Sequence, residues 1–144
     1  MIGLVTCAEH LCNGESQEPD DQRLLAALHA SGSLARSVQW DDPAIDWSAF
    51  TLCIIRSAWD YHHRHNAFLA WAEHVAYTSV LWNPLAVIRW NTHKTYLRDL
   101  EQRGVPVVPT EWLAAGERVS LVELVQRRRW SRIVVKPALA TNSF

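Results

Sequence analysis

Short runs of apolar residues constrain the fold of this chain more than any other feature. They span residues 2–5, 50–55 and 80–82, and a weaker run lies at residues 34–40. A strand that is covered on both faces has no polar side, so it reads as a continuous apolar run. Because segments with helical spacing separate these runs, we predict an α/β fold with an open, mostly parallel sheet of four strands and helices on both faces.

Two segments between the apolar runs have the spacing of helices. Asp20 or Asp21 can cap a helix with leucines on one face, and residues 67–75 carry apolar side chains at helical spacing. In an open α/β sheet, ligands bind beyond the carboxyl ends of the strands. Cys7 and residues 56–61 follow predicted strands and are therefore candidate pocket residues.

The composition is that of a globular protein, with 49% apolar residues, 20% charged residues and a net charge of −1. A chain of this charge lacks the basic surface that nucleic acid or an anionic membrane would attract. No stretch approaches the length of a membrane span, and the first residues lack the pattern of a signal peptide. We therefore expect a cytoplasmic protein whose three cysteines are reduced thiols.

The spacing pattern restarts near Pro84, so we predict two domains, residues 1–84 and residues 85–144. In the second domain, the spacing of apolar residues predicts amphipathic helices over residues 91–103 and 121–130. The eight tryptophans are spread over both halves of the chain. This distribution indicates core and domain-contact residues rather than a stacking platform for nucleic acid.

Two lysines in the second domain are candidate phosphate ligands. Residues 133–135 are β-branched and predict a buried strand, and Lys136 follows this strand directly. An ammonium group in a dry interior is costly unless an anion pairs with it. Lys94 lies in the first turn of the predicted helix 91–103, where a phosphate would offset the unfavourable helix dipole. The alternatives stay open here: a solvated strand end for Lys136, and an ordinary exposed helix position for Lys94.

Five short motifs follow one another in an order and at a spacing that resemble the ATP-grasp enzymes. Those on the nucleotide side are Asn91-Thr92-His93-Lys94, Gly104-Val105-Pro106-Val107-Val108-Pro109-Thr110 and Val134-Val135-Lys136-Pro137. The two upstream motifs are Arg56-Ser57-Ala58-Trp59-Asp60-Tyr61 and Leu81-Trp82-Asn83-Pro84. These two resemble the glutathione-synthetase-like branch, the branch that includes the cycloserine biosynthesis ligase.

This resemblance implies a Rossmann-like pre-ATP-grasp domain followed by the start of an ATP-grasp nucleotide-binding domain. It also implies an ATP-dependent carboxylate–amine ligase that acts through an acyl phosphate, with Lys94 and Lys136 on the ATP phosphates and magnesium as a second cofactor. Arg56 would be the catalytic residue, because a guanidinium can hold a carboxylate bidentately. The implied substrate-binding residues are Arg56, Trp59, Asp60 and Tyr61. For Trp59 and Tyr61, a packing role in the core is an equal alternative.

The resemblance further implies that the sequence stops early. Members of the family continue past the Val-Val-Lys-Pro strand into a second lobe that supplies acidic and Asn ligands for magnesium, whereas this sequence ends at Phe144. We therefore expect an N-terminal fragment without metal ligands and without activity of its own. The expected partners are small carboxylate and amine substrates. Apolar surface left uncovered by the unfinished lobe would favour a homo-oligomer.

Other sites and functions are weaker hypotheses. Zinc could bind the segment with Cys7, His10 and Cys12, but no fourth ligand is evident. The cluster of His62, His63 and His65 is more typical of a solvated helix start than of a site. The alternative to a ligase is a non-catalytic, flavodoxin-like α/β module that binds a small ligand or a partner protein.

Overall fold

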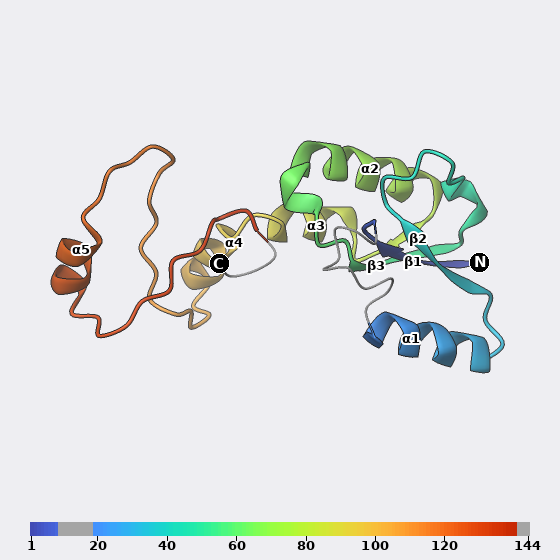
Figure 1. Cartoon of the computed structure of the whole chain (residues 1–144), viewed down its shortest axis with the longest axis horizontal. Helices are drawn as coiled ribbons and strands as arrows, with labels where there is room; N and C mark the ends of the chain where they lie inside the picture. Colours follow the sequence, from blue (N-terminus) through green and yellow to red (C-terminus); the bar gives the residue numbers. More distant parts are fainter. Residues whose placement is uncertain (9–18, 141–144) are drawn as a thin grey trace. The chain divides into compact units, whose positions relative to one another are not determined.

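The computed structural model describes residues 1–8 and 19–140, which fall into two compact units, Met1–Thr92 and His93–Phe144 (Figure 1). The strands and α-helices of the first unit are β1 (Ile2–Thr6), α1 (Pro19–Ala30), β2 (Ala35–Gln39), β3 (Leu52–Ser57), α2 (His65–Thr78), β4 (Val80–Trp82) and α3 (Leu85–Asn91), and two 3-10 helices span Trp47–Ala49 and Tyr61–His63. Those of the second unit are α4 (Tyr96–Gln102) and α5 (Leu121–Arg128). The domain boundary predicted near Pro84 remains a prediction, because a compact unit is not the same as a functional domain.

The four strands of the first unit form one parallel sheet in the order β2-β1-β3-β4. Ile2 of β1 lies opposite Ala35 of β2 and Leu52 of β3, and Leu52 lies opposite Val80 of β4. Helix α1 covers one face of the sheet, while α2 and α3 lie on the other face (Figure 1). The predicted α/β fold with an open parallel sheet is therefore confirmed.

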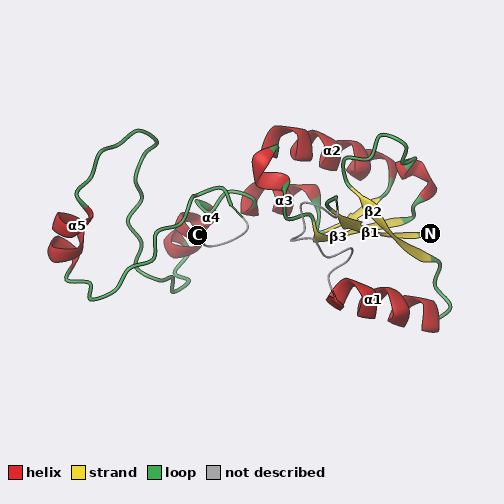
Figure 2. Ribbon diagram, viewed as in Figure 1, coloured by secondary structure: helices red, strands yellow, loops and turns green. Residues whose placement is uncertain are grey.

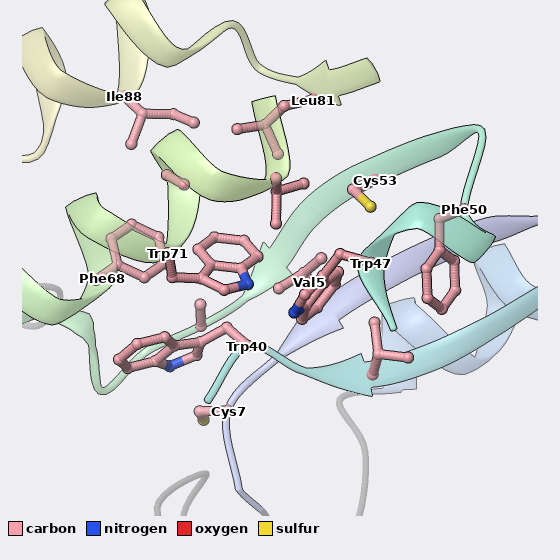
Figure 3. Close-up of a cluster of buried hydrophobic side chains, with 14 residues drawn as sticks. Val5, Cys7, Trp40, Trp47, Phe50, Cys53, Phe68, Trp71, Leu81 and Ile88 are labelled. Atoms are coloured by element: carbon pink, nitrogen blue, oxygen red, sulfur yellow. The ribbon is translucent and has the colours of Figure 1, made fainter. Parts of the chain in front are cut away.

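The core of the first unit lies between the sheet and α2, and aromatic rings fill much of it (Figure 3). Trp40 meets Phe68 edge to face, with ring centroids 5.4 Å apart and planes 87° apart. Trp47 and Trp71 make a similar contact at 5.3 Å and 71°. Such edge-to-face pairs add to the stability that burial alone provides. Three of the tryptophans are thus core residues, as predicted.

The helix predicted over residues 91–103 is wrong as a single element. Helix α3 already ends at Asn91, and α4 begins only at Tyr96. Pro84 directly precedes α3 with an extended backbone, an arrangement that suits the start of a helix because proline needs no hydrogen-bond acceptor there. Because Pro84 also marks the predicted domain boundary, α3 was not predicted from the sequence.

The strand predicted at residues 133–135 is also wrong, because this segment forms no strand and its side chains are exposed. β-branched residues favour a strand only where a neighbouring strand accepts their backbone hydrogen bonds. All strands of the described residues belong to the first unit. Figure 2 shows α4 and α5 with long loops between them and after them. The helix predicted over residues 121–130 does form, as α5, with Ser120 Oγ accepting from the amide of Glu123.

Two observations bear on the cellular environment that the sequence predicts. None of the helices in the described ranges has the length and apolar character needed to cross a membrane. Cys53 is a free, buried thiol whose pKa is raised by burial, in spite of a hydrogen bond with Ser79. Cys7, however, is disulfide-bonded. The prediction of reduced thiols is therefore wrong for Cys7, because a sequence alone does not reveal which sulfurs the fold brings within bonding distance.

Candidate functional site

The carboxyl edge of the parallel sheet brings together residues that are far apart in the sequence. Beyond the strands themselves, the Cys7 amide donates to the Ser57 carbonyl over 3.1 Å, and the Trp40 amide donates to the Thr6 carbonyl over 3.0 Å. These bonds hold the ends of β1, β2 and β3 side by side. The motif that begins at Arg56 therefore lies where parallel α/β sheets bind their ligands, as the sequence predicted.

Arg56 lies at the end of β3 and is held by a buried carboxylate from α1. Its Nε donates to Asp21 Oδ1 over 2.8 Å, and the hydroxyl of the next residue, Ser57, donates to Asp21 Oδ2 over 2.5 Å. Asp21 is 1% exposed, whereas the side chain of Arg56 is 39% exposed. The charge of Asp21 is thus compensated inside the protein, and Arg56 still presents part of its guanidinium to solvent.

A second buried carboxylate, Asp60, fixes the segment that follows Arg56. Its Oδ1 accepts from Trp40 Nε1 and its Oδ2 accepts from Arg64 Nη2, both over 2.8 Å. Arg64 also donates to Asp41 over 2.7 Å, and its guanidinium lies 4.6 Å from the centre of the Trp40 ring. The bonds to Asp41 and Asp60 raise the pKa of Arg64. With both oxygens bonded to protein groups, Asp60 has the geometry of a residue that positions its neighbours.

Trp59 and Tyr61 flank Asp60 and differ in exposure. Trp59 is exposed, so its ring is accessible beside the same strand end as Arg56. Tyr61 is partly buried, packs against the core with its ring 5.4 Å from that of Phe68, and donates from its hydroxyl to the Thr92 carbonyl. Trp59 is therefore better placed than Tyr61 to contact a ligand, although the substrate-binding role of the motif stays a prediction.

In the second unit, the structure brings together the only two lysines of the chain. The Lys94 amide donates to the Ala138 carbonyl, and Lys94 Nζ donates to the Ala140 carbonyl, both over 2.7 Å. Burial and, to a smaller extent, the positive charge of Lys136 lower the pKa of Lys94. Lys136 itself is exposed. Two cations near one another form a site that favours an anion.

Sequence reasoning placed Lys94 inside a helix, whereas the structure places it just before α4, whose N-cap is Thr95. The scarcity of lysine was a usable signal in the sequence, because all other side chains with a permanent positive charge are arginines. Asp21 and Arg64 were also missed as parts of the site. No local pattern reveals them, since their partners are supplied by the folding of β2, β3 and α1 against one another.

The candidate metal sites receive no support from the described residues. Among them, no group of three or more His, Cys, Asp or Glu side chains could hold a metal ion. His10 and Cys12 of the suggested zinc site lie outside the described residues. The rings of His62 and His63 lie 4.0 Å apart, while His65 Nε2 forms a hydrogen bond with Thr92 Oγ1 instead.

Comparison with known proteins identifies the family. Residues 2–83 match the family model described as the N-terminal domain of D-cycloserine synthetase DcsG. The cycloserine biosynthesis protein DcsG of Streptomyces lavendulae is 38% identical over 140 residues, which cover 95% of this chain and 46% of that protein. The crystal structure of D-cycloserine synthetase DcsG matches with a TM-score of 0.80 and 33% identity, covering 97% of this chain and 47% of that one.

The chain therefore spans slightly less than half the length of these two relatives. The family model covers more than half of the chain and includes the whole parallel sheet with the Asp21, Arg56 and Asp60 contacts. The match to the solved structure extends further, into the second unit. On this evidence, the chain belongs to the family of the D-cycloserine synthetase DcsG N-terminal domain.

Proposed function

We propose that this chain is part of an ATP-dependent carboxylate–amine ligase of the ATP-grasp type. In such a reaction, the substrate carboxylate attacks the γ-phosphate of ATP and yields an acyl phosphate and ADP. An amine then attacks the acyl carbon and releases phosphate. The relatives bear the name of a synthetase. The site residues described above supply positively charged groups suited to ATP and to a carboxylate substrate.

The observation that carries the proposal is that Lys136 lies close enough to Lys94 for its positive charge to lower the pKa of Lys94. A partly buried ammonium close to a second cation is disfavoured unless an anion compensates both charges. The polyphosphate of ATP is such an anion, and phosphoryl transfer depends mainly on positioning and on charge neutralisation. The Ala140 carbonyl accepts from Lys94 Nζ. A phosphate oxygen would replace this neutral acceptor with a charged one.

The carboxyl edge of the sheet is the proposed site for the carboxylate substrate. Arg56 has the charge and the planar geometry to hold a carboxylate, and Trp59 offers an exposed aromatic surface at the same strand end. Because the relatives are named for D-cycloserine, we propose a small amino-acid derivative as the substrate class. The described residues do not fit magnesium, since they contain no cluster of metal ligands, and we assign no step to a metal held by this part of the chain.

The test of the ATP site uses the two lysines with an arginine as control. Lys94→Ala and Lys136→Ala should each weaken the binding of ATP about tenfold or more, because each removes a hydrogen bond to a charged group. Arg118→Ala removes an exposed positive charge from the same unit and should leave the affinity unchanged. Calorimetric titration of ATP against the parent and the three variants measures this.

Equal affinities of the parent and both lysine variants would contradict the assignment of the ATP site. If the parent chain bound carboxylates or a protein partner but no ATP, the non-catalytic binding module would be the better interpretation. The two interpretations therefore differ in the affinity of the parent chain for ATP, which the calorimetric titration measures.

A further inference from the structure

The contact between Arg56 and Asp21 has an unusual form for an arginine–carboxylate pair. Such pairs are frequently bidentate, with two parallel N–H···O bonds from the guanidinium to the two oxygens. Here the bond joins Arg56 Nε to Asp21 Oδ1, and the second oxygen, Oδ2, accepts from the Ser57 hydroxyl over 2.5 Å. Ser57 thus donates to the oxygen that a bidentate pair would also use and competes with the guanidinium for it.

We propose that Ser57 and Asp21 are positioning residues that hold Arg56 by Nε and thereby keep its Nη1–Nη2 edge open for the carboxylate of a substrate. The nature of this ligand rests on the proposed ligase function, whereas the orientation of Arg56 follows from the contacts alone. No role for either residue is implied by the sequence motifs, which include Ser57 only as a neighbour of Arg56.

Because Asp21 and Ser57 are buried, only a protein group can replace the hydrogen bond between them. Asp21 and Ser57 are 1% and 3% exposed, so solvent offers Asp21 Oδ2 little compensation if the serine hydroxyl is removed. A buried carboxylate oxygen without a donor is costly, and the nearest guanidinium is the natural replacement. Without Ser57, Asp21 is therefore expected to take a second bond from Arg56 and to cover part of the edge that a ligand would use.

The location of Asp21 supports the same conclusion. It lies in the first turn of α1, where the helix dipole stabilises a negative charge. The carboxylate can therefore remain charged in a buried position without two bonds from one guanidinium. Its neighbour Asp20 is exposed and pairs with Arg23 on the same helix, which makes Asp20 a matched control in the same turn.

The first test measures the open edge of Arg56 directly and needs no ligand. Phenylglyoxal reacts with the two terminal nitrogens of arginine, and peptide mass spectrometry reports the rate at each site. Ser57→Ala should slow modification of Arg56 about tenfold, as expected when a new hydrogen bond to a charged group covers the edge. Ser57→Cys, which donates only weakly, should slow it as well. Arg118 serves as the internal reference because it is exposed in the other unit.

Two controls separate this effect from a general loss of structure. Ser37→Ala removes a buried hydroxyl of β2 that has no partner in the described part of the chain. Asp20→Asn removes the neighbouring charge. Both should leave the reactivity of Arg56 unchanged, with circular dichroism confirming that all variants fold. An Arg56 that reacts as fast in both Ser57 variants as in the parent would overturn the proposal.

The second test addresses the ligand and is read separately. Acetate, D-alanine and L-alanine are titrated against the parent, Arg56→Lys, Ser57→Ala and Ser37→Ala, with amide chemical shifts as the readout. We expect about tenfold weaker binding for Arg56→Lys and Ser57→Ala, because each loses one of two bonds to the carboxylate, and no change for Ser37→Ala. If no carboxylate binds the parent while the phenylglyoxal result holds, the proposed acceptor site fails but the positioning of Arg56 stands.

Discussion

At the scale of single residues, Asp60 illustrates how a buried carboxylate ties loops to the sheet. Asp60→Asn keeps the size of the side chain but replaces one acceptor oxygen with an N–H donor. Because Trp40 and Arg64 both donate to Asp60, one of them would face another donor. We expect the free energy of unfolding to fall by about 1–3 kcal/mol, the cost of an unsatisfied buried group, as measured by urea denaturation with tryptophan fluorescence.

Asp46→Asn is the matched control for this substitution. Asp46 caps the 3-10 helix Trp47–Ala49 from an exposed position, and asparagine caps a helix about as well as aspartate. Its urea midpoint should match that of the parent. An Asp60→Asn variant that is as stable as Asp46→Asn would show that the bonds of Asp60 contribute little to the fold.

The protonation of Lys94 gives a second prediction at this scale. Burial and Lys136 lower the pKa of Lys94 in the folded chain, so the unfolded chain binds this proton more tightly. Stability should therefore rise with pH between the folded pKa of Lys94 and the ordinary lysine value, where the folded state has already released the proton. An anion between the lysines has the opposite effect on the group itself and raises the pKa of Lys94.

The measurement is simple because the chain has only two lysines. Protein labelled with ¹³C-lysine should show two side-chain signals, and Lys136→Arg assigns them. We expect the Lys94 signal to titrate at a lower pH than an ordinary lysine and to move to higher pH when tripolyphosphate is added. A Lys94 signal that titrates like an ordinary lysine, with or without tripolyphosphate, would mean that Lys94 is not part of an anion site.

The exposed residues of the site could be predicted from the sequence, whereas the buried residues that hold them in place could not. Arg56 and Trp59 follow a recognisable strand, so their place at the carboxyl edge could be predicted. Their supports are bonds between residues far apart in the chain, such as Arg56 with Asp21. The identity of such a partner depends on which helix turn meets which strand end, and one sequence does not contain that information in any local pattern.

At the scale of elements, β1 shows how close packing constrains a strand. A Cβ added at Gly3 would lie 3.0 Å from Phe50 Cδ1 and 3.4 Å from Val38 Cγ2. Both neighbours are buried, so neither side chain can move freely. Gly3→Ala should lower the free energy of unfolding by about 1–3 kcal/mol through overpacking, measured by urea denaturation.

A double variant provides the control for this prediction. Phe50→Leu removes the ring atoms that the new methyl group would meet, so Gly3→Ala should cost less in a Phe50→Leu background than in the parent. This difference is the coupling energy of a double-mutant cycle. If the cost of Gly3→Ala is the same in both backgrounds, the close approach to Phe50 is not its cause.

Strands and helices could be predicted from the sequence where their local residue pattern alone determines the structure, and not where a distant neighbour is needed. Strands β1, β3 and β4 are apolar runs, and the pattern predicted each of them, although only Leu81 of the edge strand β4 is buried. Residues 133–135 have the same composition but form no strand, because composition does not reveal whether a pairing neighbour is present. Helix α3 was missed for a related reason, since its apolar residues directly follow a proline that also marks boundaries.

At the scale of the whole molecule, the second unit exposes much of its apolar surface. Val108 is 82% exposed and Val134 is 73% exposed, and Val105, Val122 and Val135 are exposed as well. Exposed apolar patches favour association. We expect the sedimentation coefficient of this chain to rise with protein concentration, and Val108→Glu/Val134→Glu to reduce that rise. Leu34→Glu, which replaces an exposed apolar residue of the first unit, should leave it unchanged.

Activity is also predicted at this scale. The described residues contain no group of three or more His, Cys, Asp or Glu side chains that could hold a metal ion, and phosphoryl transfer needs the charge of the phosphates to be neutralised. We therefore expect no ADP release from this chain alone with a panel of carboxylates and amines, assayed with magnesium present. Substrate-dependent ADP release above background, absent from Lys136→Ala, would show that these residues suffice for catalysis.

The order of the strands has a consequence for how the first unit acquires its structure. Strand β1 is made first, yet it lies inside the sheet between β2 and β3. Its pairing with β3 must therefore wait until Leu52–Ser57 has been synthesised, and until then one edge of β1 stays open. Contacts between distant segments slow folding because the intervening chain must first be closed into a loop. A growing chain of this kind should thus depend on the early β1–β2 pair to protect β1, the strand with the most buried residues, until β3 has been synthesised.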